Sequence, residues 1–253
     1  MNFLPLTAHI SDIAESFWKK AGGVTCWPCD LERAIALVLP LDIVLLSDLT
    51  IKRIEEWFHQ RHTYYQFPGK RTRLHGCLLV YRGVGFVFID GSDSKEERLF
   101  TLAHEVSHFI VEYVQPRLKA CELLGEEIIE VLDGLRPPSV EERIESIMSA
   151  INIKPHVHLL EHGGTGASAR SSIWQAEDRA DELALELVAP AEIVLSDLKA
   201  TFDSMSYFEC CHVAADILTQ KFGLPGNVAK TYARQLAQAL TGGPSVLSSL
   251  GLE

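Results

Sequence analysis

Residues 94–110 read SKEERLFTLAHEVSHFI, the stretch with the clearest structural signal in the chain. Ser94 stands three residues before Glu97, which is the capping-box pattern that begins a helix, and no glycine or proline follows until Pro116. Apolar residues recur at helical spacing, so one face of this helix can be covered by a core. They are Leu99, Leu102, Ala103, Val106, Phe109 and Ile110. The sequence therefore predicts a half-buried helix that begins near residue 95.

The same stretch contains the pattern H-E-x-x-H at residues 104–108. His104 and His108 are four residues apart, so on a helix both imidazoles project to the same side and can bind one metal ion. Glu105 lies beside them, where its carboxylate can take a proton from a metal-bound water. In the alternative interpretation, the three residues are the exposed polar edge of an ordinary amphipathic helix.

Composition and charge narrow the class of protein. The chain has 253 residues, 47% hydrophobic and 23% charged, as expected of a soluble globular protein. The formal net charge of −11 argues against direct binding of nucleic acid, which needs a basic surface. No apolar run reaches the ~18 residues that span a bilayer, and the N-terminus lacks the regions of a secretory signal. We therefore expect a cytoplasmic protein with no membrane partner.

The six cysteines are scattered along the chain, which indicates reduced thiols rather than a disulfide framework. Cys26 and Cys29 form a C-x-x-C pair, which can be a redox centre or half of a zinc site. No thioredoxin-like strand precedes this pair, and Cys210-Cys211 is the only conceivable second half. The favoured interpretation is therefore that Cys26 and Cys29 are small thiols of a core or a loop.

The segment before the 95–110 helix predicts further helices around a small β-rich part. Amphipathic helices are expected at about 7–21, 31–39 and 50–61, with a short buried strand at 41–46. Two β-rich runs, 76–81 and 84–90, predict a hairpin that leads directly into the 95–110 helix. The fold class is therefore α+β, mostly helical with a small β-sheet whose hairpin, 76–90, precedes the candidate metal-binding helix.

The region of residues 115–172 has a different character. Helices are expected at 117–133 and 140–151, and the second opens with the capping box Ser139 to Glu142. Small polar residues up to position 172 then indicate a mobile loop. A cluster of three histidines precedes this loop: His156, His158 and His162. Three interpretations are open: a second metal site, contacts for substrate or, in the favoured interpretation, half-exposed loop residues.

A helix at about 173–189 offers a third metal ligand. Its apolar face is rich in alanine, which lets another helix approach closely, and Glu177 stands at the edge of that face. A carboxylate in this position can reach a metal ion that the 95–110 helix holds. In the alternative interpretation, Glu177 is one of several solvated acids.

Three further helices are expected at about 191–200, 207–222 and 226–240. Residues 214–225 and the helix after them resemble a helix-turn-helix pair. Residues 196–253 contain four lysines or arginines and five acidic residues, so this tail is not basic. We therefore assign it a packing role.

Two motifs resemble those of the ImmA/IrrE family of zinc metallopeptidases. Residues 100–108, FTLAHEVSH, are similar to the family pattern F-T-L-A-H-E-x-G-H. Residues 177–190, EDRADELALELVAP, are similar to its second motif, E-x-x-A-N-x-F-A-x-x-L-L-M-P. The order of helix, strand, helix and hairpin before the first motif also fits. The resemblance covers about residues 25–112 and 173–225.

The resemblance implies a zincin-like metallopeptidase domain, in which a sheet edge above the metal can hold an extended peptide. It implies one zinc ion bound by His104, His108 and Glu177, with Glu105 as the catalytic general base. Asp181 is then a residue that contacts the ligands without binding the ion. Family members cleave helix-turn-helix repressors, so the expected partner is a transcriptional repressor in stress response, mobile-element or defence regulation.

The chain departs from the family pattern at several points. Ser107 replaces a glycine, Leu183 a phenylalanine and Asp181 an asparagine, and the long gap between the motifs makes residues 115–172 look like an insertion. We expect a metallopeptidase domain over residues 1–200 that contains this insertion, and a small helical subdomain with a frayed end over 201–253.

Two questions stay open at the level of sequence. A zincin domain can also act without proteolysis, as a regulatory module that sequesters a repressor or belongs to a toxin–antitoxin pair. The intact Glu105 favours an enzyme, since binding alone needs no base. Substrate-binding residues are unknown; four residues are candidates for a second electrophile beside the metal: Tyr113, His156, His158 and Arg170.

Overall fold

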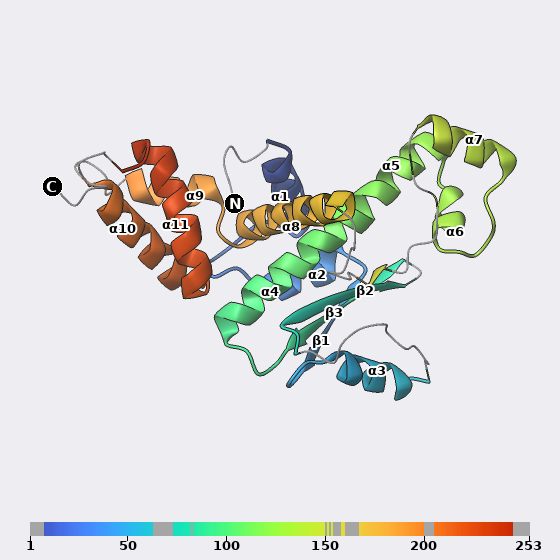
Figure 1. Ribbon diagram of the computed structural model, residues 1–253, viewed down its shortest axis with the longest axis horizontal. Helices are drawn as coiled ribbons and strands as arrows, with labels where there is room; N and C mark the ends of the chain where they lie inside the picture. Colours follow the sequence, from blue (N-terminus) through green and yellow to red (C-terminus); the bar gives the residue numbers. More distant parts are fainter. Residues whose placement is uncertain are drawn as a thin grey trace. The chain divides into compact units, whose positions relative to one another are not determined.

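The computed structural model describes residues 8–62, 73–81, 83–149, 151, 153, 158–159, 167–199 and 205–244 (Figure 1). The described part is mostly helical with a small sheet, which confirms the α+β class. The helices are α1 (Ala8–Lys20), α2 (Leu31–Val38), α3 (Ile51–His59), α4 (Lys95–His108), the π-helix η1 (Phe109–Val114), α5 (Gln115–Leu124), α6 (Ile128–Leu132), α7 (Val140–Met148), α8 (Ala167–Val188), α9 (Ala191–Lys199), α10 (Tyr207–Gln220) and α11 (Gly226–Thr241). The strands are β1 (Leu41–Leu46), β2 (Gly76–Tyr81), β3 (Val84–Asp90) and β4 (His158–Leu159).

The chain divides into two compact units. One contains residues 1–38, 94–103 and 181–253, and the other contains residues 39–93 and 104–180. Helices α10 and α11, which the sequence assigns to a separate tail, therefore belong to the same unit as α1, α2 and α9. The boundary expected at residue 200 stays a prediction.

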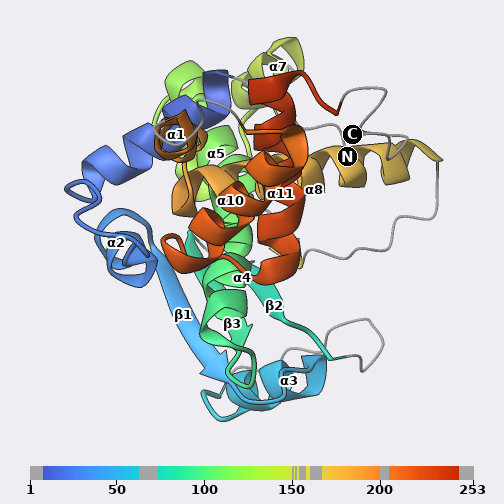
Figure 2. The same ribbon diagram turned by 90° about the vertical axis from the view of Figure 1, so that its left-hand side faces the viewer.

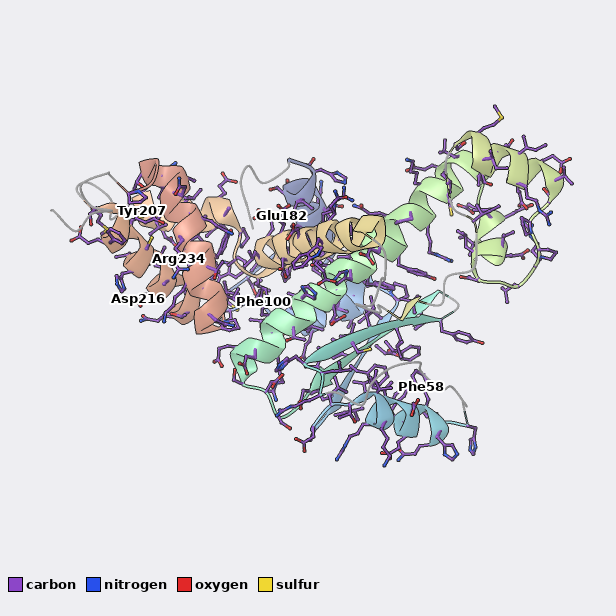
Figure 3. All side chains as sticks on the ribbon, viewed as in Figure 1. Phe58, Phe100, Glu182, Tyr207, Asp216 and Arg234 are labelled. Carbon is purple, nitrogen blue, oxygen red and sulfur yellow. The ribbon has the colours of Figure 1, made fainter. Side chains whose placement is uncertain are left out.

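The sheet belongs to the second unit and has the strand order β1-β3-β2-β4. Strand β1 runs parallel to β3, whereas β2 and β3 form the antiparallel hairpin expected at 76–90. On one face, Trp57 and Phe58 of α3 pack against Phe86 and Phe88 of β3, with ring centroids 5.3 to 6.0 Å apart. Figure 3 shows Phe58 on α3, the helix that covers this face. The aromatic layer anchors β3, the strand that leads towards α4.

On the other face, a glycine lets η1 approach the sheet. A Cβ atom built on Gly85 would lie 2.9 Å from Cε2 and 3.1 Å from Cδ2 of Phe109. The Phe109 ring is fully buried and stacks on Tyr113, with centroids 5.2 Å apart, so it has little room to move. Because Phe109 follows His108 directly, this contact fixes the end of α4 that carries His108.

We expect Gly85→Ala to lower the free energy of unfolding by about 1–3 kcal/mol, because the added methyl group overpacks the contact with Phe109. Urea denaturation of the full chain measures the effect. The matched control is Gly226→Ala, since a Cβ there meets nothing within 4 Å and alanine favours the helix. A Gly85→Ala protein as stable as the wild type would contradict the expectation.

A buried carboxylate holds the turn between β3 and α4. Asp90 accepts hydrogen bonds from the backbone N–H groups of Asp48 and Ser92, at 3.0 and 2.9 Å, and pairs with Nε of Arg73 at 3.0 Å. Burial by itself raises the pKa of Asp90, but these hydrogen bonds more than offset burial and lower the pKa to about 2. Helix α4 then begins with the expected capping box, in which Ser94 and Glu97 exchange hydrogen bonds of 3.2 Å.

The first unit is built around the C-terminal part of α8. Nε1 of Trp18 in α1 donates to the carbonyl of Leu187 at 3.0 Å, and the hydroxyl of Tyr232 in α11 donates to the carbonyl of Ala189 at 3.3 Å. Helices α10 and α11 lie side by side (Figures 1 and 2). Within the described residues, we find no helix with the length and apolar character needed to cross a membrane.

Three expectations for residues 115–172 are corrected. The helix expected at 117–133 is two helices, α5 and α6, because the chain turns at Gly125 with a φ of +84°. The loop expected up to residue 172 ends earlier, since α8 already begins at Ala167. Strand β4 pairs with Leu79 and Val80 of β2, so this part of the hairpin edge is not open to an extended peptide. The histidines at 156 and 162 lie outside the described residues, as does the side chain of His158.

Candidate metal centre

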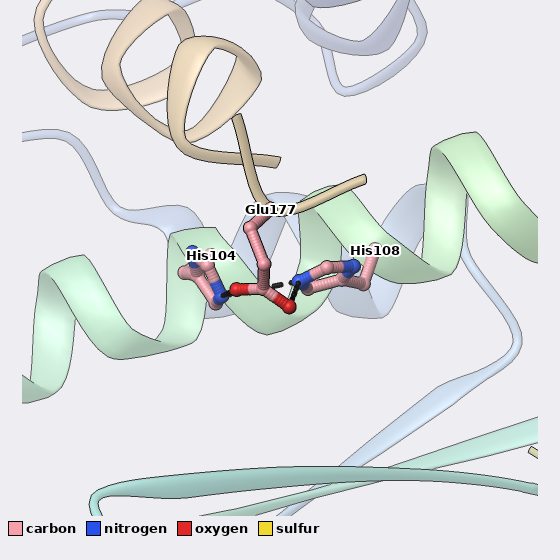
Figure 4. Close-up of side chains that lie close together, drawn as sticks. All are labelled: His104, His108 and Glu177. Carbon is pink, nitrogen blue, oxygen red and sulfur yellow. Dashed lines mark hydrogen bonds and ion pairs between the residues drawn. The ribbon is translucent and has the colours of Figure 1, made fainter. Parts of the chain in front are cut away.

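Three side chains predicted as ligands converge in the second unit (Figure 4). His104 and His108 project from one side of α4, and Glu177 reaches them from α8. The two Nε2 atoms are 3.1 Å apart. The carboxylate oxygens of Glu177 lie 3.5 Å from Nε2 of His104 and 3.6 Å from Nε2 of His108. This cluster could hold a metal ion.

The spacing of the three groups fits a tetrahedral ion. Nitrogen and oxygen ligands at about 2.0–2.1 Å from zinc stand about 3.3 Å from one another at the tetrahedral angle. The observed separations of 3.1, 3.5 and 3.6 Å bracket this value. Two imidazoles and one carboxylate are also the donor set of catalytic zinc sites that leave the fourth position for water or substrate.

A fourth residue, which the sequence analysis did not identify, orients one of the histidines. Nδ1 of His108 lies 3.2 Å from Oε1 of Glu112, one turn further along the chain. A proton on Nδ1 shared with this carboxylate leaves the lone pair of Nε2 directed at the cluster. The His108 side chain is only 1% exposed, and the carboxylate of Glu112 contacts its Nδ1 within this buried setting. The four-residue spacing from His108 was the available sequence signal.

We expect Glu112→Gln to weaken zinc binding about 10- to 100-fold, the usual effect of removing a partner behind a metal ligand. Competition with a chromophoric chelator measures the zinc dissociation constant. Glu122→Gln, which changes an exposed glutamate of α5, serves as the matched control. Equal zinc affinity in the Glu112→Gln and wild-type proteins would mean that Glu112 does not support the site.

The predicted general base is a largely buried residue of the helix that carries both histidines. Glu105 follows His104 on α4 and is 9% exposed. Burial raises the pKa of the Cys77 thiol in β2 to about 12, and the neighbouring negative charge of Glu105 contributes to this rise. The thiol of Cys77 is therefore protonated at neutral pH and supplies neither a thiolate ligand nor a nucleophile.

Helix α4 continues directly into the π-helix η1, which the sequence analysis did not predict. Tyr113 of η1, a candidate electrophile, stacks on Phe109 with the guanidinium of Arg117 4.9 Å from its ring centroid. Burial raises the pKa of its hydroxyl, which also hydrogen-bonds to Gly83 and Arg117. Tyr113 thus has a packing role. The other candidates, including Arg170, have side chains outside the described residues.

The remaining predicted residues are Asp181 and the cysteines. Asp181 follows Glu177 by one turn of α8 and is half-buried, and its role behind the ligands stays a prediction. The six cysteines are free thiols, as expected. Burial raises the pKa of the Cys29 thiol to about 12, and its sulfur lies 3.9 Å from the carbonyl of Leu187. Cys29 is therefore a structural thiol of the core.

Comparisons of the chain with models of protein families, with curated proteins and with solved structures give no match.

Proposed function

We propose that the protein is a zinc-dependent endopeptidase with a zincin-like domain. The observation that carries this proposal is the convergence of His104, His108 and Glu177, with a carboxylate, Glu105, on the same helix as the two histidines. A site that only binds a structural metal needs no such base. The resemblance of residues 100–108 and 177–190 to the ImmA/IrrE motifs supports the same assignment.

The chain's residues take separate roles in this proposal. His104, His108 and Glu177 hold the ion, and Glu112 keeps the ring of His108 in register. When bound, zinc supplies Lewis-acid chemistry, because it polarises the scissile carbonyl and makes water a stronger acid. Glu105 accepts the proton of the attacking water and delivers it to the amine that leaves. His104 and Glu177, with side chains 20% and 26% exposed, form the accessible side of the site.

The proposed substrate is a protein, in particular a helix-turn-helix repressor, as the motif resemblance implies. The test incubates the purified full chain with repressors encoded by neighbouring genes, with added zinc and with a chelator such as 1,10-phenanthroline. Mass spectrometry should detect fragments that end at one defined bond and that disappear with the chelator. Tight binding of a repressor without fragments would favour the alternative, a non-proteolytic regulatory module.

A further inference from the structure

Trp174 of α8 is a large aromatic side chain that stays exposed next to the candidate metal centre. Its exposed fraction is 65%. It stands three residues before Glu177, the carboxylate that reaches the two histidines from the same helix (Figure 4). Trp174 and the three residues of the cluster belong to the same unit. Exposed tryptophans next to a site are among the residues that most often contribute to binding.

The other three tryptophans of the chain are packed against protein groups. Trp18 donates a hydrogen bond to a main-chain carbonyl of α8, and the ring centroid of Trp27 lies 4.9 Å from that of Phe222. Trp57 packs against the aromatic rings of β3. Within the residues that the structure describes, Trp174 has no comparable hydrogen bond or ring contact. Its indole therefore does not serve the packing of a core.

The helix brings Trp174 and Glu177 close together on one side of α8. Residues three apart on a helix have Cβ atoms about 5–6 Å from each other. Helical side chains lean towards the N-terminus, so the side chain of Glu177 points back towards the turn of Trp174. The carboxylate of Glu177 also lies 3.5 and 3.6 Å from the Nε2 atoms of the two histidines. The indole is therefore within reach of a molecule bound at the metal centre.

The apolar surface of the indole, and not the charge around it, defines what Trp174 can bind. The ionisable residues near it on α8 carry both signs: Asp178 is acidic, and Arg170 and Arg179 are basic. Charge therefore selects neither a cationic nor an anionic group. A ring that is mostly in water is stabilised when an apolar group covers it, and large aliphatic and aromatic side chains cover the most area.

We propose that Trp174 is a specificity-determining residue, which binds a large apolar side chain of the substrate next to the bond that is cleaved. This inference rests on the proposed function. It narrows the substrate class to protein segments with leucine, isoleucine, methionine or phenylalanine at that position. A side chain held on the indole fixes the place of the neighbouring peptide bond at the centre, so Trp174 acts by positioning and takes no part in the chemistry.

The first experiment uses small hydroxamates, which bind zinc through their two oxygens and require no identified substrate. Nα-acetyl-leucine hydroxamate is compared with the glycine compound, which lacks a side chain, and with the cationic lysine compound. Isothermal titration calorimetry with the zinc-loaded full chain measures each dissociation constant. We expect the leucine compound to bind about tenfold more tightly than the glycine compound. Equal binding of these two, or tightest binding of the lysine compound, would overturn the proposal.

Variants then test whether the preference resides in the indole. Trp174→Ala should abolish the preference for the leucine compound and leave the affinities for zinc and for the glycine compound unchanged, whereas Trp174→Phe should retain part of the preference. The matched control is Phe208→Ala, which removes a 50% exposed aromatic ring of α10 and should keep the full preference. A preference that persists in Trp174→Ala would overturn the proposal. A loss of zinc affinity in this variant would also overturn it, since the ring would then support the metal centre itself.

The glycine compound separates this proposal from the function on which it rests. If the zinc-loaded wild type does not bind the glycine compound, the centre has no open position, and the peptidase and the role of Trp174 fail together. If the glycine compound binds and the leucine compound has no advantage, only the role of Trp174 fails. The fragments of a cleaved repressor give an independent check, because a large apolar residue should adjoin the cut. A cut flanked by small or charged residues alone would overturn the proposal and leave the peptidase in place.

Discussion

Glu105→Gln is expected to lower the rate of peptide cleavage about 10²- to 10⁴-fold, the usual contribution of a general base, with the zinc content unchanged. Glutamine has nearly the shape of glutamate, so the packing around this buried position is kept. Its amide cannot accept the proton of the attacking water. The variant therefore removes one chemical step and leaves His104, His108 and Glu177 in place.

The measurement pairs single-turnover cleavage of the repressor with metal analysis of the same preparation. Glu96→Gln is the matched control, because Glu96 is an exposed carboxylate in the first turn of the same helix. A Glu105→Gln protein that cleaves at the wild-type rate would disprove the role of the base. Loss of both zinc and activity would instead show that the metal site needs Glu105 to stay intact.

Local patterns in the sequence were sufficient to predict the elements that carry the histidines. The capping box at Ser94 and Glu97 gave the start of α4, and the β-rich runs gave the bounds of β2 and β3. Each of these signals lies within a few neighbouring residues. The position of Glu177 was also predicted, because the alanine-rich face of α8 indicates a close approach to another helix.

Other features depend on contacts that no local pattern contains. Strand β4 pairs with β2 through Leu79 and Leu159, which are eighty positions apart. The capping box at Ser139 and Glu142 predicted the helix that is α7, but a capping box does not reveal which side of a helix faces the core. In the structure the apolar side of α7 is exposed, and Glu142 on the other side of the helix pairs with Arg136. Glu112 was missed although its four-residue spacing from His108 is a local signal, because spacing alone does not show that the ring turns Nδ1 towards the carboxylate.

Glu177→Ala is expected to weaken zinc binding by more than about 100-fold. This is a larger effect than the removal of a residue that only supports a metal ligand. Glu177 supplies both oxygens that face the histidines, at 3.5 and 3.6 Å. Without this carboxylate, Nε2 of His104 and Nε2 of His108 are the remaining atoms of the cluster. The ion then has two protein ligands instead of the three that catalytic zinc sites use, so the affinity falls.

Zinc-dependent stabilisation gives this prediction a second measurement. A ligand present at 100 times its dissociation constant raises the free energy of unfolding by about 2.7 kcal/mol, so zinc should raise the melting temperature of the wild type. The Glu177→Ala protein should show almost no shift at the same zinc concentration. Asp178→Ala, the adjacent acidic residue on α8, is the matched control and should keep the shift. If Glu177→Ala bound zinc with wild-type stoichiometry and affinity, the third ligand would have to be sought elsewhere.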